Sequence, residues 1–344
     1  VIGAVAGFGL YHASFGFTSA WRRVLVERKG AGLRAQFLLI ILISAISFPL
    51  IAYGSGIGFP VVGAVAPISV AMVFGAFLFG VGMQFGGGCG SGTLFTVGGG
   101  SARMLITLAA FIAGSLAGTF HLPWWRAMPK MAGWSMVENL GPVWAFISLA
   151  AILLSIAYVT IYREKSAHGE LEKPRQTASI LYGPWSPLAG VVALAFVGIA
   201  TFLILGRPWG ITSAFSLWGA KTASMAGIDV ASWPYWSNKT AWLNRSVFSD
   251  TTSVMNFGII AGAMAASGLA SKYRPTWRLN RGEITTALIG GLLMGYGARL
   301  AYGCNIGAYL GGLMSGSLHG WIWMIAAFFG SALAIKYLSR FETR

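Results

Sequence analysis

The feature that most constrains this chain is a series of apolar runs, each long enough to cross a lipid bilayer as one helix. A helix needs roughly 20 apolar residues to span the ~30 Å hydrocarbon core of a membrane. Such runs occur at residues 1–20, 35–53, 61–85, 103–121, 142–162, 188–206, 250–270, 283–302 and 318–338. These runs predict an all-α polytopic membrane protein with about nine transmembrane helices.

The composition supports this class and excludes a nucleic-acid partner. Hydrophobic residues make up 56% of the 344 residues and charged residues only 10%, which is too little polar surface for a water-soluble globule. The net charge is +15, but the cations lie in short loops between the apolar runs. That distribution is typical of topology signals and of contacts with lipid headgroups, so membrane lipid is the expected macromolecular partner.

The positions of the cations also predict an orientation. With the N-terminus outside, 17 of the 24 Lys and Arg residues fall in cytoplasmic segments, as the positive-inside rule favours. We therefore expect a periplasmic N-terminus and a cytoplasmic C-terminus. The most charged stretch lies within residues 163–187, which we interpret as a cytoplasmic linker between a first membrane repeat, 1–162, and a second, 188–344.

An internal repeat relates the two halves. Sliding the sequence by 215 positions lays Cys89 on Cys304, and these are the only two cysteines. The same shift superimposes five glycine pairs, namely Gly75 on Gly290, Gly80 on Gly295, Gly82 on Gly297, Gly88 on Gly303 and Gly92 on Gly307. Five expected spans separate the equivalent points. Because five is odd, the second copy enters the membrane from the opposite side, and the repeats are expected to be inverted.

A second motif occurs once in each half. Residues 15–21 read Phe-Gly-Phe-Thr-Ser-Ala-Trp, and residues 209–215 read Trp-Gly-Ile-Thr-Ser-Ala-Phe. The shared hydroxyl side chains are candidate hydrogen-bonding groups of a substrate path: Thr18, Ser19, Thr212 and Ser213. Each half therefore carries two special segments, and four such segments from the two membrane faces are expected to converge on one central point.

The cysteine segments point to a small anion as substrate. Several glycines within 86–92 weaken a helix, so this stretch is expected to be a re-entrant turn with short helix ends and free amides, which attract anions. No apolar run has a central Asp or Glu, which argues against a cation channel or an acidic proton relay. The path residues that we expect beside the cysteines are Gly90, Ser91, Gly303 and Asn305.

The two cysteines carry the sharpest hypothesis. A neutral thiol is a weak hydrogen-bond donor and is polarizable, which suits a sulfur atom of a substrate. The paired glycines have an alternative explanation, because small residues let membrane helices pack closely without any role in transport. Arg299 lies five residues before Cys304; it either attracts the substrate or extends to an interface, and both readings stay open.

Together these motifs resemble the YeeE/YedE family of sulfur transporters. The resemblance rests on Phe85 to Gly92, on Gly297 to Ala308 and on the stretch from Phe17 to Arg22, and it covers both halves of the chain. It implies a bacterial inner-membrane protein that takes up thiosulfate or a related sulfur or selenium species. It also implies an hourglass shape, in which cysteines at a constriction pass the ion by transient hydrogen bonds.

The chain departs from the family pattern at one position. Gly16 stands where the family often has a further cysteine, so one position of the cysteine relay is absent. The resemblance further implies that a small cytoplasmic sulfur carrier of the TusA type is a possible partner.

Two other classes remain as alternatives. A membrane thiol oxidoreductase would pass disulfides between Cys89 and Cys304, although the chain has no Cys-x-x-Cys pair. A scaffold subunit would use the cysteines only for packing. We expect no enzyme activity, no metal site and no cofactor, because the cysteines have no nearby His, Asp or Glu and the chain has no nucleotide-binding loop.

Overall fold

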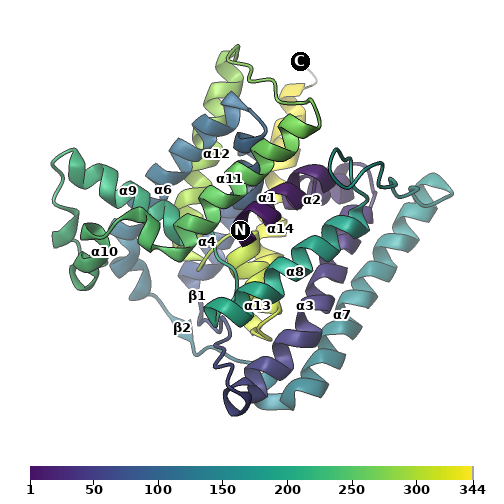
Figure 1. Ribbon diagram of the computed structural model, residues 1–344, viewed down its shortest axis with the longest axis horizontal. Coiled ribbons are helices and arrows are strands. Elements are labelled where there is room, and N and C mark those ends of the chain that lie inside the picture. The colour runs from purple at the N-terminus through teal and green to yellow at the C-terminus, as the bar shows by residue number, and fades with distance from the viewer. Residues whose placement is uncertain (343–344) are drawn as a thin grey trace.

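The computed structural model describes residues 1–342 and is built almost entirely of helices (Figure 1). The helices and the two short strands are α1 (Ile2–Ala13), α2 (Phe17–Val26), α3 (Ala31–Tyr53), η1 (Gly54–Ile57), β1 (Ile68–Ser69), α4 (Val70–Gly86), α5 (Gly90–Gly98), α6 (Ala102–Arg126), β2 (Lys130–Met131), α7 (Met136–His168), α8 (Pro187–Leu205), α9 (Thr212–Met225), η2 (Val230–Ser232), η3 (Ser237–Lys239), α10 (Thr240–Asn244), η4 (Val247–Ser249), α11 (Thr251–Leu269), α12 (Arg281–Leu300), η5 (Asn305–Leu310), α13 (Gly311–Leu313) and α14 (Leu318–Glu342). Strands β1 and β2 pair antiparallel, with Ile68 opposite Met131.

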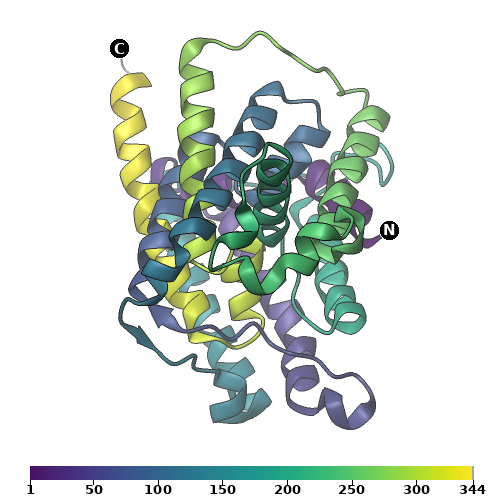
Figure 2. The same cartoon turned by 90° about the vertical axis from the view of Figure 1, so that its left-hand side faces the viewer.

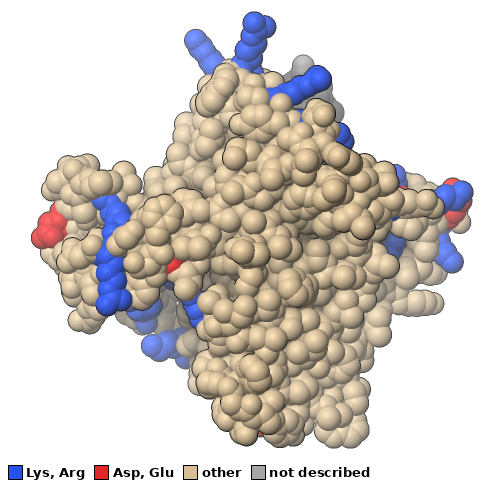
Figure 3. All heavy atoms as spheres, in the orientation of Figure 1, with Lys and Arg blue, Asp and Glu red and all other residues tan. Residues whose placement is uncertain are grey.

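Within the described residues, eight helical segments are long and apolar enough to cross a membrane. They correspond to eight of the nine expected spans and confirm the all-α polytopic class. Two of the eight continue through a short helix that a cysteine caps, since the segments 70–98 and 281–313 include α5 and η5–α13 respectively. Figure 3 shows why such a surface suits lipid, because Lys and Arg lie at the periphery of the face and the middle carries other residues.

The expected span at residues 1–20 is not one continuous helix. This stretch holds two short helices, because Ser14 adopts a left-handed conformation (φ 49°) that ends α1, and Gly16 is the extended N-cap of α2. Helix α1 packs along α11, one of the eight membrane-crossing segments. Hydropathy alone does not register this break, since the residues around it are apolar.

The internal repeat is visible in the packing of α4 against α12. A Cβ on Gly75 would lie 2.7 Å from the Gly297 carbonyl oxygen, and one on Gly82 would lie 2.8 Å from that of Gly290. The two backbones are therefore in direct contact. The later residue of α4, Gly82, contacts the earlier residue of α12, Gly290, so the two helices run antiparallel. A shift of 215 positions turns Gly75 into Gly290 and Gly82 into Gly297, so it converts each contact into the other. An inverted repeat requires this arrangement.

The same symmetry extends to the helices that flank this pair. Helix α6 packs on α12, and α14 packs on α4. The Ser115 hydroxyl donates to the Gly295 carbonyl oxygen at 3.4 Å, and the Ser331 hydroxyl donates to that of Gly80 at 3.0 Å. The repeated sequence thus builds a repeated scaffold of close helix contacts, which the small residues permit.

The expected linker 163–187 begins as helix, because α7 ends only at His168. Its first residues are held in place: buried Glu164 accepts a hydrogen bond from Arg34 at 2.7 Å and one from the Gly30 amide at 3.0 Å. At the opposite side of the molecule, the short helices between α9 and α11 form an outer layer that faces the viewer in Figure 2. Buried Trp236 fastens this layer by donating to the Thr119 hydroxyl at 3.1 Å.

Candidate substrate path

Cys89 and Cys304 occupy equivalent positions at the starts of two short helices. Cys89 is the N-cap of α5 and Cys304 the N-cap of η5, and both have extended backbones (φ −85°, ψ −169° and φ −101°, ψ −167°). Each is preceded two positions earlier by a left-handed residue, Gly87 (φ 80°) and Tyr302 (φ 62°). Such residues end helices, so each long helix stops and a new short helix begins at the cysteine.

The two cysteine segments meet inside the protein. Both thiols are buried, with 1% and 0% of each residue exposed. A Cβ placed on Gly90 would lie 3.0 Å from the Cys304 Sγ and 3.5 Å from Ile211 Cγ2. The N-terminus of α5 therefore lies against the second thiol, and no side chain separates them. Because helix N-termini carry free amides and partial positive charge, this junction favours an anion.

The first thiol already has polar partners. Cys89 Sγ lies 3.4 Å from the Ser91 hydroxyl oxygen and accepts a hydrogen bond from the Gly92 amide at 3.5 Å. The Thr93 hydroxyl donates to the Cys89 carbonyl oxygen at 2.8 Å. The expected path residues Gly90 and Ser91 are thus brought together with Cys89, and Ser91 orients its thiol.

Several buried polar groups on the second cysteine segment and on the two copies of the second motif have no hydrogen-bond partners. Asn305 is fully buried, and neither its amide oxygen nor its amide nitrogen has a hydrogen bond within the described residues. The same holds for Thr18 Oγ1, Trp209 Nε1 and Tyr309 Oη. Unpaired buried polar groups are uncommon and costly unless water or a ligand satisfies them.

These groups come from segments that the two motifs position. Tyr309 lies on η5, and its ring packs 6.2 Å from that of Phe17 and 5.9 Å from that of Trp21, both on α2. On the other side, a Cβ on Gly307 would approach Gly210 to 3.9 Å. Helix η5 therefore contacts both copies of the second motif, residues 15–21 and 209–215, as the expected convergence of the special segments requires.

The hydroxyl candidates separate into two groups. Thr18 is buried and its hydroxyl is unpaired, whereas Ser19 is exposed and donates to the Gly16 carbonyl oxygen at 3.3 Å. Ser19 lines a pocket of about 520 Å³ together with cationic side chains of Arg23, Arg34, Lys173 and Arg175 and the carboxylate of Glu172. Thr212 is half-buried and Ser213 exposed. Gly303 is buried next to Cys304, with φ at 155°.

Arg299 points away from the cysteines. Its guanidinium donates to the Ser216 hydroxyl at 3.3 Å and lies 5.2 Å from the centre of the Tyr235 ring. Lys239 and Arg126 approach the same ring, at 3.7 Å and 5.9 Å. Burial acts to raise the pKa of Tyr235, but the charges of Arg299, Lys239 and Arg126 outweigh it and hold that pKa below its ordinary value.

Four polar or aromatic residues of this region were not among the candidate site residues that the sequence indicated. Trp209 belongs to the second motif, but only the hydroxyl side chains of that motif were candidates, and Tyr309 passed as an ordinary aromatic residue of an apolar segment. Tyr235 lies in the polar stretch between spans. Asn256 is fully buried on α11 and donates to the Ile211 carbonyl oxygen at 3.0 Å, with its own oxygen unpaired. Its one available signal was an amide inside an otherwise apolar run.

Comparison with known proteins shows which family the sequence belongs to. Residues 12–333 match the family described as Sulphur transport. The chain belongs to the Sulphur transport family. That match covers both cysteine segments and both copies of the second motif, so the residues discussed above lie within the part of the chain that defines membership.

Named relatives in the family are bacterial proteins. The chain is 32% identical over 153 residues to a probable transporter, YedE, of Escherichia coli, an alignment that covers 44% of this chain and 38% of YedE. It is 24% identical over 347 residues to the thiosulfate transporter TsuA of Escherichia coli, covering 96% and 91% of the two chains. The TsuA of Spirochaeta thermophila is 29% identical over 278 residues, covering 74% and 73%. Thus the chain spans less than half the length of YedE and most of the length of either TsuA.

As a member of the Sulphur transport family, the chain offers a polar junction with little formal charge. Among residues 1–339, the buried carboxylate is Glu164, which is paired with Arg34 far along the sequence from either cysteine. The junction instead provides two thiols, the amides of two helix starts and several neutral polar side chains. Such a set can replace the hydration of a small anion without binding it tightly.

Proposed function

We propose that this member of the Sulphur transport family takes up thiosulfate across the bacterial inner membrane, through the junction of Cys89 and Cys304. The observation that carries the proposal is that two buried cysteines, one from each inverted repeat, start two short helices that meet. The thiosulfate transporters among the relatives support the choice of ion. A selenium compound or another reduced sulfur anion is the alternative cargo with the same chemistry.

The proposed role of the junction is to replace the water around the anion. Moving an isolated anion into a buried site costs many kcal/mol unless hydrogen bonds compensate. The amides at the starts of α5 and η5 and the side chain of Ser91 supply donors, and Asn305 and Thr18 supply groups that have no other partner. The neutral thiols donate weak hydrogen bonds to the ion as it passes, so no bond to sulfur forms or breaks.

Cations at either end of the path are proposed to concentrate the anion. On the periplasmic side, Arg299 acts with Lys239 and Arg126 around Tyr235, and long-range attraction of this kind raises encounter rates. On the cytoplasmic side, the pocket of Ser19 holds four cationic side chains. In the proposed orientation the N-terminus lies in the periplasm and the C-terminus in the cytoplasm, with α1, which packs along α11, as a ninth membrane segment beside the eight longer ones. The cytoplasmic pocket is also where a small sulfur carrier of the TusA type would receive the ion.

The test is uptake of ³⁵S-labelled thiosulfate by a bacterium that lacks its own sulfate and thiosulfate importers. Cys89→Ala and Cys304→Ala are each expected to reduce uptake at least about tenfold, because each removes a donor from the desolvated ion. Ser331→Ala is the matched control, since it removes a buried hydroxyl from the α4–α14 contact only.

Uptake that survives both cysteine substitutions would overturn the assigned path. An unmutated chain that supports selenium uptake but not thiosulfate uptake would move the proposal to the alternative cargo. A disulfide between Cys89 and Cys304 that forms during turnover would instead favour thiol exchange.

A further inference from the structure

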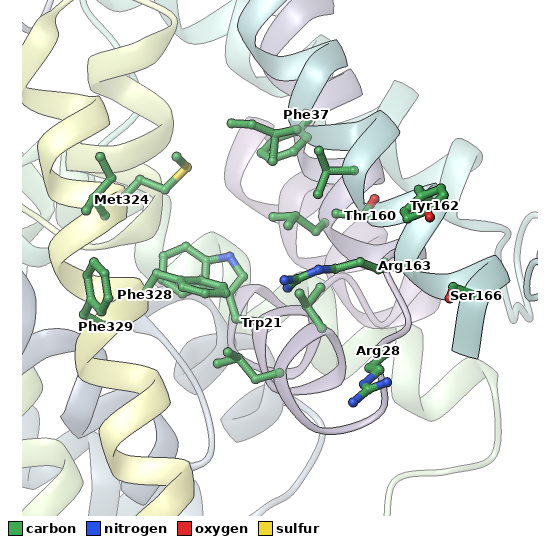
Figure 4. Close-up of a pocket in the computed structure, with 17 residues that line it drawn as sticks. Trp21, Arg28, Phe37, Thr160, Tyr162, Arg163, Ser166, Met324, Phe328 and Phe329 are labelled. Atoms are coloured by element: carbon green, nitrogen blue, oxygen red, sulfur yellow. The ribbon is translucent and has the colours of Figure 1, made fainter. Parts of the chain in front are cut away.

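A cavity of about 650 Å³ lies between α2, α3, α7 and α14, away from the cysteine junction (Figure 4). Its size is within the range of known ligand sites, about 300–1,000 Å³. Most of its lining is apolar, including Phe37 from α3 and Met324 and Phe328 from α14. Its rim carries Val159, Ile325 and Phe329, which are 52%, 48% and 66% exposed. Since these residues lie on membrane-crossing helices, the cavity opens sideways toward lipid.

One end of the cavity is cationic. Arg163 points into the cavity in Figure 4, and Arg28 and Ser166 lie on the same side of it, away from Phe37 and Met324. Within residues 1–339, no carboxylate pairs with Arg28 or Arg163. Their neighbours Arg23 and Arg34 are paired, with Glu172 at 2.8 Å and Glu164 at 2.7 Å. The two arginines at the cavity are therefore available to an external anion.

Arg28 also holds an unfavourable backbone conformation. Its φ is 56°, a left-handed value at which glycine is usual just after a helix. An arginine there gives up some stability and places a guanidinium at the cavity mouth. An apolar groove with two free cations at one end matches the shape and charge of a lipid with an anionic headgroup.

The cavity shares a wall with the cysteine segment. Trp21 lines it, is fully buried, and donates its indole N–H to Gln36 at 3.1 Å. The Trp21 ring lies 5.5 Å from that of Phe328 on the cavity side and 5.9 Å from that of Tyr309 on η5. A ligand that packs against Trp21 and Phe328 therefore acts on the helix that starts at Cys304.

We propose that this cavity binds one anionic phospholipid, with its phosphate on Arg28 and Arg163 and an acyl chain between α2 and α14, and that the bound lipid steadies the Trp21–Tyr309 contact for transport. The binding claim concerns this cavity alone. The regulatory claim rests on the proposed thiosulfate uptake.

Binding is tested on the purified full chain in detergent, by native mass spectrometry and thermal stability with phosphatidylglycerol against phosphatidylcholine. Arg28→Gln/Arg163→Gln is expected to weaken phosphatidylglycerol binding by on the order of tenfold to thirtyfold, as two headgroup contacts are lost. Arg274→Gln/Arg278→Gln, exposed cations on the α11–α12 loop, removes the same charge elsewhere and is expected to leave binding unchanged. Val159→Trp is expected to block the acyl chain.

Three results would overturn the site. The first is equal binding of phosphatidylglycerol and phosphatidylcholine, and the second is an equal loss of phosphatidylglycerol binding in the two double variants. The third is a dimer of the chain that forms through this face and that Arg28→Gln/Arg163→Gln abolishes. Transport is measured separately in phosphatidylcholine vesicles with increasing phosphatidylglycerol. Uptake should rise with phosphatidylglycerol for the unmutated chain and the control, but not for Arg28→Gln/Arg163→Gln. Absence of uptake in all vesicles would refute the proposed function while the binding result stands.

Discussion

The two cysteine segments share a backbone plan and differ in what surrounds the thiol. Around Cys89 the helix is regular and the thiol has Ser91 and the Gly92 amide as partners. Around Cys304 the helix opens into a π-helix, and the buried side-chain amide of Asn305 and hydroxyl of Tyr309 have no hydrogen-bond partner. The scaffold contacts of α4 and α12, by contrast, repeat closely. Symmetry thus fixes where the segments meet, while unlike side chains give the junction two different sides.

The largest expected effect comes from filling the junction itself. Gly90→Val puts a branched side chain against Cys304 Sγ, which a Cβ alone would already approach to 3.0 Å. Overpacking of this kind costs about 1–3 kcal/mol, and thiosulfate uptake should fall at least about tenfold. Gly92→Ala is the control, because its Cβ would meet Cys89 Sγ at an ordinary 3.6 Å. Equal uptake by the two variants would contradict the junction.

A second change tests the symmetric scaffold. Gly290→Ala drives a methyl group into the backbone of Gly86 and Gly82 on α4. We expect a loss of about 1–3 kcal/mol of stability, measured as a lower unfolding temperature in detergent. Gly268→Ala, on α11 with no atom near its added Cβ, should leave that temperature nearly unchanged. An unaltered Gly290→Ala protein would mean that α4 and α12 are not in backbone contact.

A third change sharpens the contrast between the two sides. Asn305→Leu replaces a buried amide that has no partner, so the protein should become more stable by about 1 kcal/mol while uptake falls several-fold. Asn256→Leu should instead destabilise the protein, because it removes the bond to the Ile211 carbonyl oxygen. Thermal unfolding and uptake are measured on both. If Asn305→Leu transports normally, the unpaired amide does not serve the ion.

The smallest effect compares two equivalent hydroxyls. Ser115→Ala and Ser331→Ala each remove one hydrogen bond from a hydroxyl to a carbonyl oxygen of the facing helix. In membrane proteins such bonds contribute about 0.6 kcal/mol on average, so the two variants should lose similar, small amounts of stability and retain uptake. A large difference between their unfolding temperatures would show that the two hydrogen bonds do not contribute equally to the stability of the two repeats.

Much of this organisation could be predicted from the sequence. Cys89 and Cys304, with their flanking glycines, indicated the repeat, and the odd number of spans between them indicated its inversion. The glycines also predicted short helices, because glycine weakens a helix and the exposed backbone at membrane depth must then be buried in protein. The boundaries at 162 and 188 stay a prediction, and α7 continues past the first of them to His168. The break after Ala13 was missed because a change in the backbone angle of one serine does not alter hydropathy.

Side-chain direction was harder to predict than position. Arg299 is close to Cys304 along the chain, yet its side chain turns to Ser216 and Tyr235, since the helix ends between the two residues. Ser19 and Ser213 share a motif with Thr18, but only Thr18 is buried. Neither outcome follows from spacing, because each depends on which neighbouring helix covers that face.

The glycine contacts between α4 and α12 have a consequence for the speed of transport. Backbones this close leave no side chains that could slide past each other, so rocking one repeat against the other would first have to pull the two helices apart. We therefore expect the flux to have a low activation enthalpy and a shallow temperature dependence. Because the groups at the junction replace the water that the ion loses, uptake would slow only slightly on cooling.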